Sequence, residues 1–508
     1  MKKKIINSKY VWLAVMVIAF SACNDEEDIE KDFGIYEEEA ILPELIVGEA
    51  DFSNYIAVGA SFSAGYTDNA LFIKGQENSF PNILAQQFAL VGGGTFNQPL
   101  MGDNIGGFLV GGTVEAAPRL YFNTETSTPT VLQQTPTTEI TTSVLADYGG
   151  AINNYGVPGL KSFHLGVAGY GTLNPYFGRM ASGTSAMVLS DAVAQNPTFF
   201  TLSEIGGNDV LGFALAGGDG TDQTGNIDPS TYGSSDITDP NVFAASFSAA
   251  VNALTANGAK GVVTNVPYIT SLAHFTTVPY NPIPLDEATA TVVNQAYAQY
   301  NGGLQLALNN GLISSDEASA RTIAFEASET NAVVIEDESL TDLSGLGLPN
   351  YRQATEQDLL VLPASSFIGT EAVPGNPLTV NGVAVPLADK WVLVPAEQEA
   401  IKTATDSYNQ TIKTIAEAKN LALVDFKTLL LKASSPAGLS DGNYILSTSL
   451  ATGGLISLDG VHLTSRGYAA LANQMLKAID ATYGTNFEAS GNLVDIGSYP
   501  TNYSPTLQ

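Results

Sequence analysis

The chain has 508 residues, 44% of them hydrophobic, and its formal net charge is −31 at pH 7. A surface of that charge repels a phosphate backbone, so the composition argues against nucleic-acid binding. The single cysteine excludes a disulfide bond within the chain, and the hydrophobic content is ample for a folded core.

The first 22 residues are expected to be a signal peptide that does not belong to the fold. Four lysines lie within the first nine residues, and the apolar run over 11–20 that follows is too short to span a bilayer comfortably. Small residues then precede Cys23, an arrangement that resembles a bacterial lipoprotein signal, although Phe20 stands where leucine is more usual. We therefore expect a lipid on Cys23. The alternative is an ordinary secretory signal followed by a free thiol.

Residues 23–50 are predicted to form an acidic flexible tether. Residues 24–50 hold eleven acidic side chains and one lysine, and acidic runs of this kind are usually solvated. The segment 24–28 after Cys23 resembles the acidic export signal of surface lipoproteins in Bacteroidetes. The alternative is a plain tether that faces the periplasm. Either interpretation anchors the protein by its lipid to a bacterial outer membrane.

Five short apolar runs bounded by turn residues predict buried parallel strands. They cover residues 55–58, 151–154, 198–205, 261–266 and 421–424. Helical patterns occupy residues 79–90, 242–256, 285–310, 395–419 and 468–483. Strands that alternate with helices predict a parallel sheet covered on both faces, and we assign this three-layer α/β/α domain to residues 51–485.

Two regions exceed a minimal α/β domain. Residues 91–150 are rich in Gly, Thr and Pro and are expected to form loops or short antiparallel strands. Residues 271–394 form a longer insertion with one clear helix, and their later part, 359–393, is predicted as a small β-hairpin lobe. Insertions in such sheets tend to lie at the rim of the active site. Residues 486–508 are predicted as a C-terminal tail.

The chain has only three histidines, and one of them, His462, follows Asp459 by three residues. An imidazole can take and give a proton near neutral pH, and an adjacent carboxylate can fix its tautomer and stabilise its charged form. Far upstream, Ser61 follows the predicted strand 55–58, and Gly59 allows a sharp turn before it. A helix that starts there would direct unpaired N–H groups toward the site. Taken alone, Ser61 also fits the common role of a helix N-cap.

Two more segments follow predicted strands. Gly159 comes after the strand 151–154, where a residue without a side chain lets a backbone N–H approach a ligand closely. Asn208 comes after the strand 198–205, and its neutral amide suits an oxyanion hole. Each segment alone also fits an ordinary turn. Open α/β sheets bind ligands beyond the carboxyl ends of their strands, so Ser61, Gly159 and Asn208 are expected at one edge of the sheet.

Four segments in this order resemble the motif blocks of GDSL-type lipases and acylhydrolases of the SGNH hydrolase superfamily. They are residues 59–65, 154–159, 206–209 and 459–462. The resemblance implies a flavodoxin-like three-layer fold with a five-stranded parallel sheet. It does not extend to the insertion at 271–394.

The same resemblance implies a role for each site residue. Ser61 would be the nucleophile, His462 the general base and Asp459 the residue that orients it. The Ser61 N–H, the Gly159 N–H and the Asn208 side chain would form the oxyanion hole. The substrate would be a carboxylic ester, and no cofactor would be needed.

Ala60 departs from the family pattern, because family members usually carry aspartate there, and its side chain braces the nucleophile loop. Phe62 stands where they carry leucine. The nucleophile itself remains, so the predicted function is a serine esterase or lipase, with reduced activity left open. Two other functions also fit the sequence. One is a non-catalytic surface lipoprotein that binds glycans or nutrients, and the other is a carbohydrate deacetylase of the same fold.

The other candidate ligand-binding residues are predicted to be structural. His164 lies near the expected cleft and His274 lies just past the strand 261–266, but neither belongs to a cluster. Scattered histidines and a tethered cysteine make no metal site. The glycine-rich segment 217–222 faintly suggests calcium, yet the spacing of Asp219 and Asp222 does not match an EF-hand loop. No metal site is therefore predicted.

Overall fold

The computed structural model describes residues 42–133, 135, 139–144 and 148–507. The predicted signal peptide, Cys23 and residues 23–41 of the predicted tether lie outside these described residues. The chain divides into two units, and the larger one, Leu45–Glu488 with Asn492–Gln508, holds every element named below. Among the described residues, no helix combines the length and apolar character that a membrane span requires.

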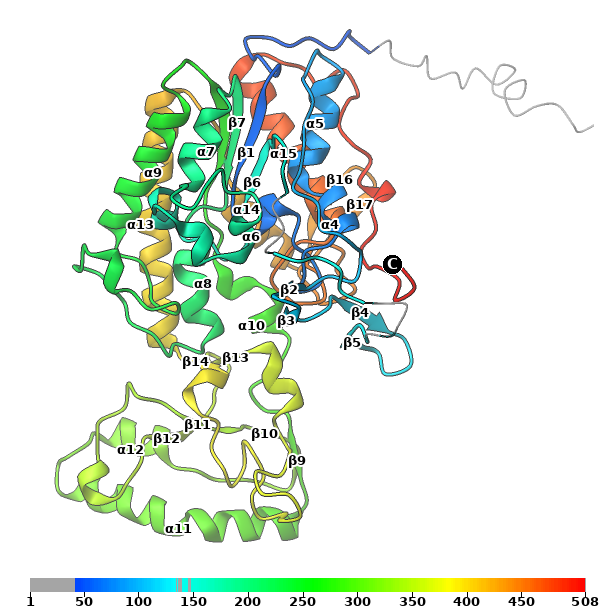
Figure 1. Ribbon diagram of the computed structural model, residues 1–508. Helices are drawn as coiled ribbons and strands as arrows, with labels where there is room; N and C mark the ends of the chain where they lie inside the picture. Colours follow the sequence, from blue (N-terminus) through cyan, green and yellow to red (C-terminus); the bar gives the residue numbers. More distant parts are fainter. Residues whose placement is uncertain (1–41, 134, 136–138, 145–147, 508) are drawn as a thin grey trace, which may run out of the picture. The chain divides into compact units, whose positions relative to one another are not determined.

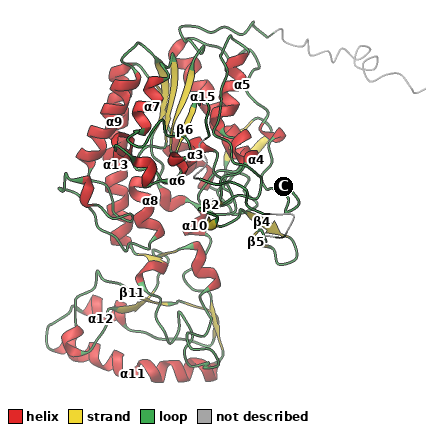
Figure 2. Cartoon of the chain, viewed as in Figure 1, coloured by secondary structure: helices red, strands yellow, loops and turns green. Residues whose placement is uncertain are grey.

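A five-stranded parallel sheet forms the centre of this unit, as Figure 2 shows in yellow. Its strands follow the order β15 (Ala422–Val424), β8 (Lys260–Thr264), β7 (Phe199–Ser203), β1 (Tyr55–Gly59) and β6 (Asn154–Gly156). All residues of β1, β6 and β7 are buried. Their apolar runs are continuous because helices cover both faces of the sheet, as expected for parallel strands.

Two groups of helices cover the sheet (Figure 1). The helices α5 (Phe80–Ala89) and α15 (Ser465–Tyr483) pack on one face, and α7 (Val188–Ala194), α9 (Pro240–Leu254) and α13 (Pro395–Lys419) pack on the other. Helix α9 begins two residues earlier than predicted, because the Asp239 side chain accepts hydrogen bonds from the N–H groups of Asn241 and Val242. The predicted three-layer α/β/α fold is confirmed.

Shorter elements connect these layers. The remaining helices of the core are α3 (Ser61–Ala64), α4 (Ile73–Glu77), α6 (Pro175–Gly178), α8 (Asn208–Leu215), α10 (Ala273–Thr276) and α14 (Phe426–Ser434). Region 91–150 contains the antiparallel pairs β2 (Phe108–Val110) with β3 (Thr113–Ala116) and β4 (Leu120–Asn123) with β5 (Thr128–Val131). A further pair, β16 (Leu439–Asp441) with β17 (Tyr444–Leu446), precedes α15. The short antiparallel strands expected in region 91–150 are therefore present.

The later insertion contains a lobe of its own, which we call the insertion lobe (residues 283–393). It contains the helices α11 (Glu287–Asn309) and α12 (Ser315–Arg321), and the strand pairs β9 (Ile283–Leu285) with β10 (Ser328–Asn331), β11 (Val334–Glu336) with β12 (Tyr351–Gln353) and β13 (Leu359–Leu360) with β14 (Val392–Leu393). The small β-hairpin lobe predicted over 359–393 is present in part. Its two ends pair antiparallel as β13 and β14, and Glu371 forms an antiparallel bridge with Val380 between them. The rest of this stretch consists of turns and 3₁₀ segments.

The second predicted strand is wrong in its range, since β6 covers Asn154–Gly156 and not residues 151–154. Gly156 reads as a turn residue in the sequence, but it pairs with Gly59 in the parallel register. Helix α3 passes so close to Gly156 that a Cβ there would overlap the backbone of Ser63 and Ala64. The glycine lets the nucleophile helix lie directly on the sheet.

Replacing Gly156 by alanine is therefore expected to destabilise the protein by about 1–3 kcal/mol, because the added methyl group forces α3 off the sheet. Urea unfolding measures this change. Gly302 offers a matched control, because it lies in α11 with open space where its Cβ would be. Gly302→Ala should leave stability unchanged or raise it slightly. Equal unfolding midpoints for wild type and Gly156→Ala would contradict the packing argument.

Candidate active site

Ser61 is the first residue of α3, directly after β1 and the turn at Gly59 and Ala60. Its side chain is 7% exposed, and its Oγ lies 2.9 Å from His462 Nε2, although the two residues are 401 positions apart. The N-cap of α3 is Ala60, which makes no side-chain cap. Ser61 is therefore not the helix N-cap that the sequence also allowed, and its hydroxyl contacts an imidazole.

Asp459 holds the other side of the imidazole. Its Oδ2 lies 2.9 Å from His462 Nδ1, and its Oδ1 accepts 2.8 Å hydrogen bonds from the N–H groups of Val461 and His462. Burial alone would raise the pKa of Asp459, but the charge of His462 and these hydrogen bonds outweigh burial and hold the pKa well below its usual range. An ionised Asp459 favours the tautomer with the proton on Nδ1, which leaves Nε2 to accept the Ser61 proton.

The chain after α3 holds this pair in place. Asn69 N–H donates to Asp459 Oδ2 at 2.9 Å, and the Asp68 side chain accepts from Leu458 N–H at 3.1 Å. The Tyr66 ring lies 4.5 Å from the His462 ring, measured between centroids. Segments from both ends of the chain therefore fix the plane of the imidazole.

The predicted oxyanion-hole residues lie in two adjoining turns. Gly159 is exposed and has φ +79°, with open space where a Cβ would be. Asn208 begins α8, and its Nδ2 donates to Leu160 O at 3.0 Å. Asp209 ties the same two turns together, because its carboxylate accepts from the N–H and the hydroxyl of Ser162 at 2.8 and 2.6 Å. An amide nitrogen carries two hydrogens, so the bond to Leu160 leaves Asn208 a second donor.

Glu204 is a residue of this site that the sequence analysis missed. It follows β7 with φ +52°, a conformation that is rare for a residue with a side chain. Its Oε1 accepts from the N–H groups of Ala60 at 2.6 Å and Ser63 at 2.9 Å. Glu204 thus braces the nucleophile loop from the neighbouring strand, a role that an aspartate at position 60 has in the family that the sequence resembles. The only sequence signal was an acidic residue at the end of a buried apolar run.

Replacing Glu204 by alanine is expected to lower kcat for the reaction proposed below by about 10- to 100-fold, because two buried N–H groups of the nucleophile loop lose their acceptor. Steady-state ester hydrolysis measures this effect. Glu204→Gln keeps a carbonyl oxygen for the same two N–H groups and should retain most of the activity. An alanine variant as active as wild type would show that the loop needs no brace.

Glu204 should also make stability depend on pH. Burial raises the pKa of Glu204 to about 7, although hydrogen bonds from Ser63 and Ala60 oppose the shift. The folded protein then binds a proton that the unfolded chain has lost, so the contribution of this group to stability falls as pH rises from about 4.5 to about 7. Unfolding curves across this pH window should show a smaller decline for Glu204→Gln than for wild type. Parallel pH profiles would contradict the assignment.

An apolar cavity of about 50 Å³ adjoins Ser61. Glu204 and Asn208 are among its lining residues. Its apolar lining comes from Phe62, Leu211, Pro267, Ile269, Leu272, Phe426, Leu430, Ile456, Val461 and Leu463. A narrow cavity with this lining suits a small apolar group of a bound molecule whose reacting atom lies next to Ser61.

The other two histidines, His164 and His274, make contacts that support the fold. The Nδ1 of His164 accepts from Lys161 N–H at 3.1 Å, and its ring stacks on Tyr170. Burial, together with the charge of Lys161, lowers the pKa of His164 to about 4. His274 is 8% exposed, and its backbone N–H donates to Gly460 O at 2.9 Å. His274 therefore supports the loop that carries Asp459 through its backbone.

No protein-family model and no curated protein matches the chain. Among solved structures, the chain is similar to an extracellular lipase from Streptomyces rimosus, with 11% identity and a TM-score of 0.28. That alignment covers 85% of this chain and 99% of the lipase chain. A likeness this slight carries no argument about function, so the proposal below rests on the geometry of the site.

Proposed function

We propose that the protein is a serine esterase that hydrolyses carboxylic esters through an acyl-enzyme intermediate. The observation that carries the proposal is the continuous chain of contacts from Ser61 Oγ to His462 Nε2 and from His462 Nδ1 to Asp459 Oδ2, each 2.9 Å long. A serine hydroxyl is a weak nucleophile until a base takes its proton. This arrangement supplies the base and a carboxylate that orients it.

In the proposed reaction, Ser61 Oγ attacks the ester carbonyl carbon while its proton passes to His462 Nε2. The carbonyl oxygen becomes an oxyanion, for which the N–H groups of Ser61 and Gly159 and the Asn208 amide are the proposed donors. Collapse of the intermediate breaks the bond to the alcohol, which leaves with the proton from His462. Water then attacks the acyl-enzyme, His462 takes its proton and returns it to Ser61, and the acid is released. No cofactor enters these steps.

The surroundings of Ser61 support an ester with an apolar acyl group. The cavity beside Ser61 is lined mainly by apolar side chains, among them Leu211, Leu272 and Phe426. An acyl chain placed there would lose contact with water, which favours its binding. We further propose that lipid on Cys23 anchors the enzyme to the outer membrane, where acylated lipids or glycans supply such esters.

Hydrolysis of a series of p-nitrophenyl esters, from acetate to longer acyl chains, tests the proposal. The wild-type chain without residues 1–22 should turn over at least part of the series with saturation kinetics, and His462→Ala should lose this activity. Equal rates for the two proteins would overturn the proposal. Acetate release from acetylated polysaccharides, with no turnover of longer acyl esters, would favour the carbohydrate deacetylase. A wild type inactive on every ester would favour the non-catalytic binder.

A further inference from the structure

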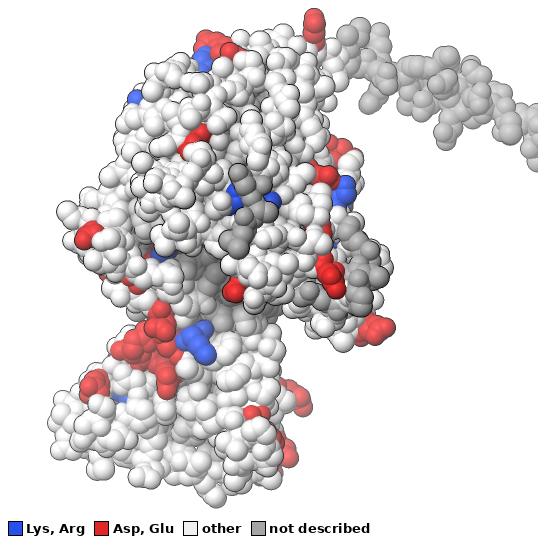
Figure 3. Space-filling model, in the orientation of Figure 1, with Lys and Arg blue, Asp and Glu red and all other residues white. Residues whose placement is uncertain are grey.

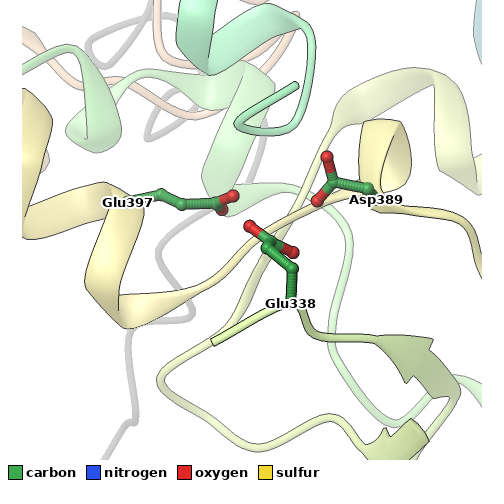
Figure 4. A group of neighbouring side chains, drawn as sticks. All are labelled: Glu338, Asp389 and Glu397. Carbon is green, nitrogen blue, oxygen red and sulfur yellow. The ribbon is translucent and has the colours of Figure 1, made fainter. Parts of the chain in front are cut away.

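Three carboxylates lie close together where the insertion lobe joins the α/β core. None of them belongs to the proposed active site. Glu338 follows β11, Asp389 begins the 3₁₀ segment Asp389–Trp391, and Glu397 lies in the first turn of α13. One oxygen from each carboxylate lies within 4.8 Å of the others. Figure 4 shows the three side chains directed toward one another.

The most buried of the three, Glu397, has an oxygen without a partner. Glu397 is only 7% exposed. Its Oε2 accepts from Val394 N–H at 2.7 Å, but its Oε1 is buried and accepts no hydrogen bond. Asp389 Oδ1 is in the same state. A buried carboxylate oxygen without a donor is costly, so both oxygens call for a positively charged or proton-bearing partner.

No basic side chain supplies that partner. Within the described part of the chain, no lysine or arginine forms an ion pair with Glu338, Asp389 or Glu397. The neighbouring Lys390 places its ammonium over the Trp391 ring, 5.2 Å from the centroid. The three carboxyl groups therefore have no basic side chain beside them to balance a negative charge.

The glycine-rich segment after α8 lies against the same carboxylates. Gly218 has φ +92°, and a Cβ there would overlap the Glu397 carboxylate. A Cβ on Gly217 would overlap the backbone of Asp389. Only glycines allow the backbone to lie this close, so the segment 217–220 closes one side of the cluster. This segment is part of the one that faintly suggested calcium in the sequence.

A groove beside the cluster is lined by further oxygen-bearing side chains, although one of them, Asp337, forms an ion pair with Arg352. This open groove of about 400 Å³ adjoins the cluster and is lined by Asp219, Asn350 and the acidic residues Glu336 to Glu338 and Asp389, with no lysine or arginine among its described lining. Figure 3 shows acidic side chains gathered at this junction. The candidate ligand atoms of the cluster are carboxylate oxygens. Oxygen ligands favour a hard cation over zinc or another ion that prefers nitrogen or sulfur.

We propose that Glu338, Asp389 and Glu397 bind a calcium ion that fastens the insertion lobe to the α/β core. Calcium takes oxygen ligands at about 2.3–2.6 Å, so two of its ligands can stand up to about 5 Å apart, a span that includes the spacing of these three carboxylates. The mixed, irregular ligand geometry suits calcium better than magnesium, which demands a near-ideal octahedron. Glu338 and Asp389 come from the insertion lobe and Glu397 from α13, so the ion would join two parts of the fold.

Terbium luminescence tests this site directly, because Tb³⁺ replaces Ca²⁺ at oxygen sites and emits when a nearby tryptophan is excited. Trp391, two residues from Asp389, is the only tryptophan of the described residues. Excitation of the full chain without residues 1–22 should give Tb³⁺ emission that CaCl₂ displaces, with a Kd for calcium of about 0.1–1 mM. Thermal unfolding should shift upward when CaCl₂ replaces EDTA. Neither readout depends on esterase activity.

Matched variants separate this site from general binding to an acidic surface. Glu338→Gln removes one ligand charge at an exposed position, and it should weaken Tb³⁺ binding by about tenfold or more and abolish the calcium-dependent thermal shift. Glu329→Gln removes an exposed charge from β10 in the same lobe and should change neither readout. Equal responses from the two variants, or no response from wild type, would overturn the site. If low pH without calcium stabilised wild type but not Glu338→Gln, the calcium proposal would be wrong. The carboxylates would then share a proton.

Discussion

Replacing Ser61 by alanine is expected to lower kcat for p-nitrophenyl ester hydrolysis by about 10⁴- to 10⁶-fold. The substitution removes the only atom that the mechanism bonds to the substrate, while His462, Asp459 and the oxyanion donors remain. Any residual rate would then come from water bound near the imidazole. The fold should not change, because the only hydrogen bond found for this hydroxyl among the described residues is the one to His462. Initial rates, with circular dichroism as a folding check, measure the effect.

Ser63 supplies the matched control for this prediction. It lies in the same short helix and its side chain is buried, but no hydrogen bond joins its hydroxyl to His462, unlike that of Ser61. Ser63→Ala should therefore retain wild-type kcat within a few fold, because the alanine keeps the backbone N–H that donates a hydrogen bond to Glu204 Oε1. If Ser61→Ala retained activity while Ser63→Ala lost it, the nucleophile would be misassigned.

Replacing Asp459 by asparagine is expected to lower kcat by about 10³- to 10⁴-fold with little change in KM. Asparagine keeps an oxygen for the N–H groups of Val461 and His462, so the loop should keep most of its conformation, although Asn69 N–H loses its acceptor. Its NH₂ group would then face His462 Nδ1 and favour the tautomer with the proton on Nε2. That tautomer cannot accept the Ser61 proton. Kinetics on the best substrate of the ester series measure the loss.

Asp286 is the control for the aspartate substitution. Its carboxylate caps α11 by accepting from Thr289 N–H and faces no imidazole. Asparagine is an equally good N-cap, so Asp286→Asn should keep both activity and stability. A kcat for Asp459→Asn within about tenfold of wild type would mean that the carboxylate does not orient the base.

The central sheet could be predicted from the sequence because its strands are buried on both faces. Runs such as Tyr55–Gly59 and Phe199–Ser203 are almost continuously apolar, and a short run of that kind between turn residues is typical of a buried parallel strand. Helix α13 matches its predicted range at both ends. Pro395 and Glu397 mark its start, and Asn420 ends it in the left-handed conformation.

What escaped prediction depends on contacts between distant segments. Gly156 reads as a turn residue in the sequence, but it pairs with Gly59 in β6, and its missing side chain leaves room for α3. Glu204 reaches from β7 to the N–H groups of Ala60 and Ser63, a contact that no local pattern encodes. The same is true of the Glu338, Asp389 and Glu397 cluster, whose members belong to different segments. Residues brought together by topology alone leave no periodic signal in the chain.

Mass spectrometry after reaction with a fluorophosphonate probe tests the central claim most directly. The probe reacts with a serine whose hydroxyl is activated by a base, and it does not require knowledge of the substrate. We predict one adduct per chain, located on the peptide that contains Ser61, and no adduct in Ser61→Ala or His462→Ala. A folded wild-type protein that remains unlabelled, or an adduct that persists in Ser61→Ala, would contradict the assignment of Ser61 as an activated nucleophile.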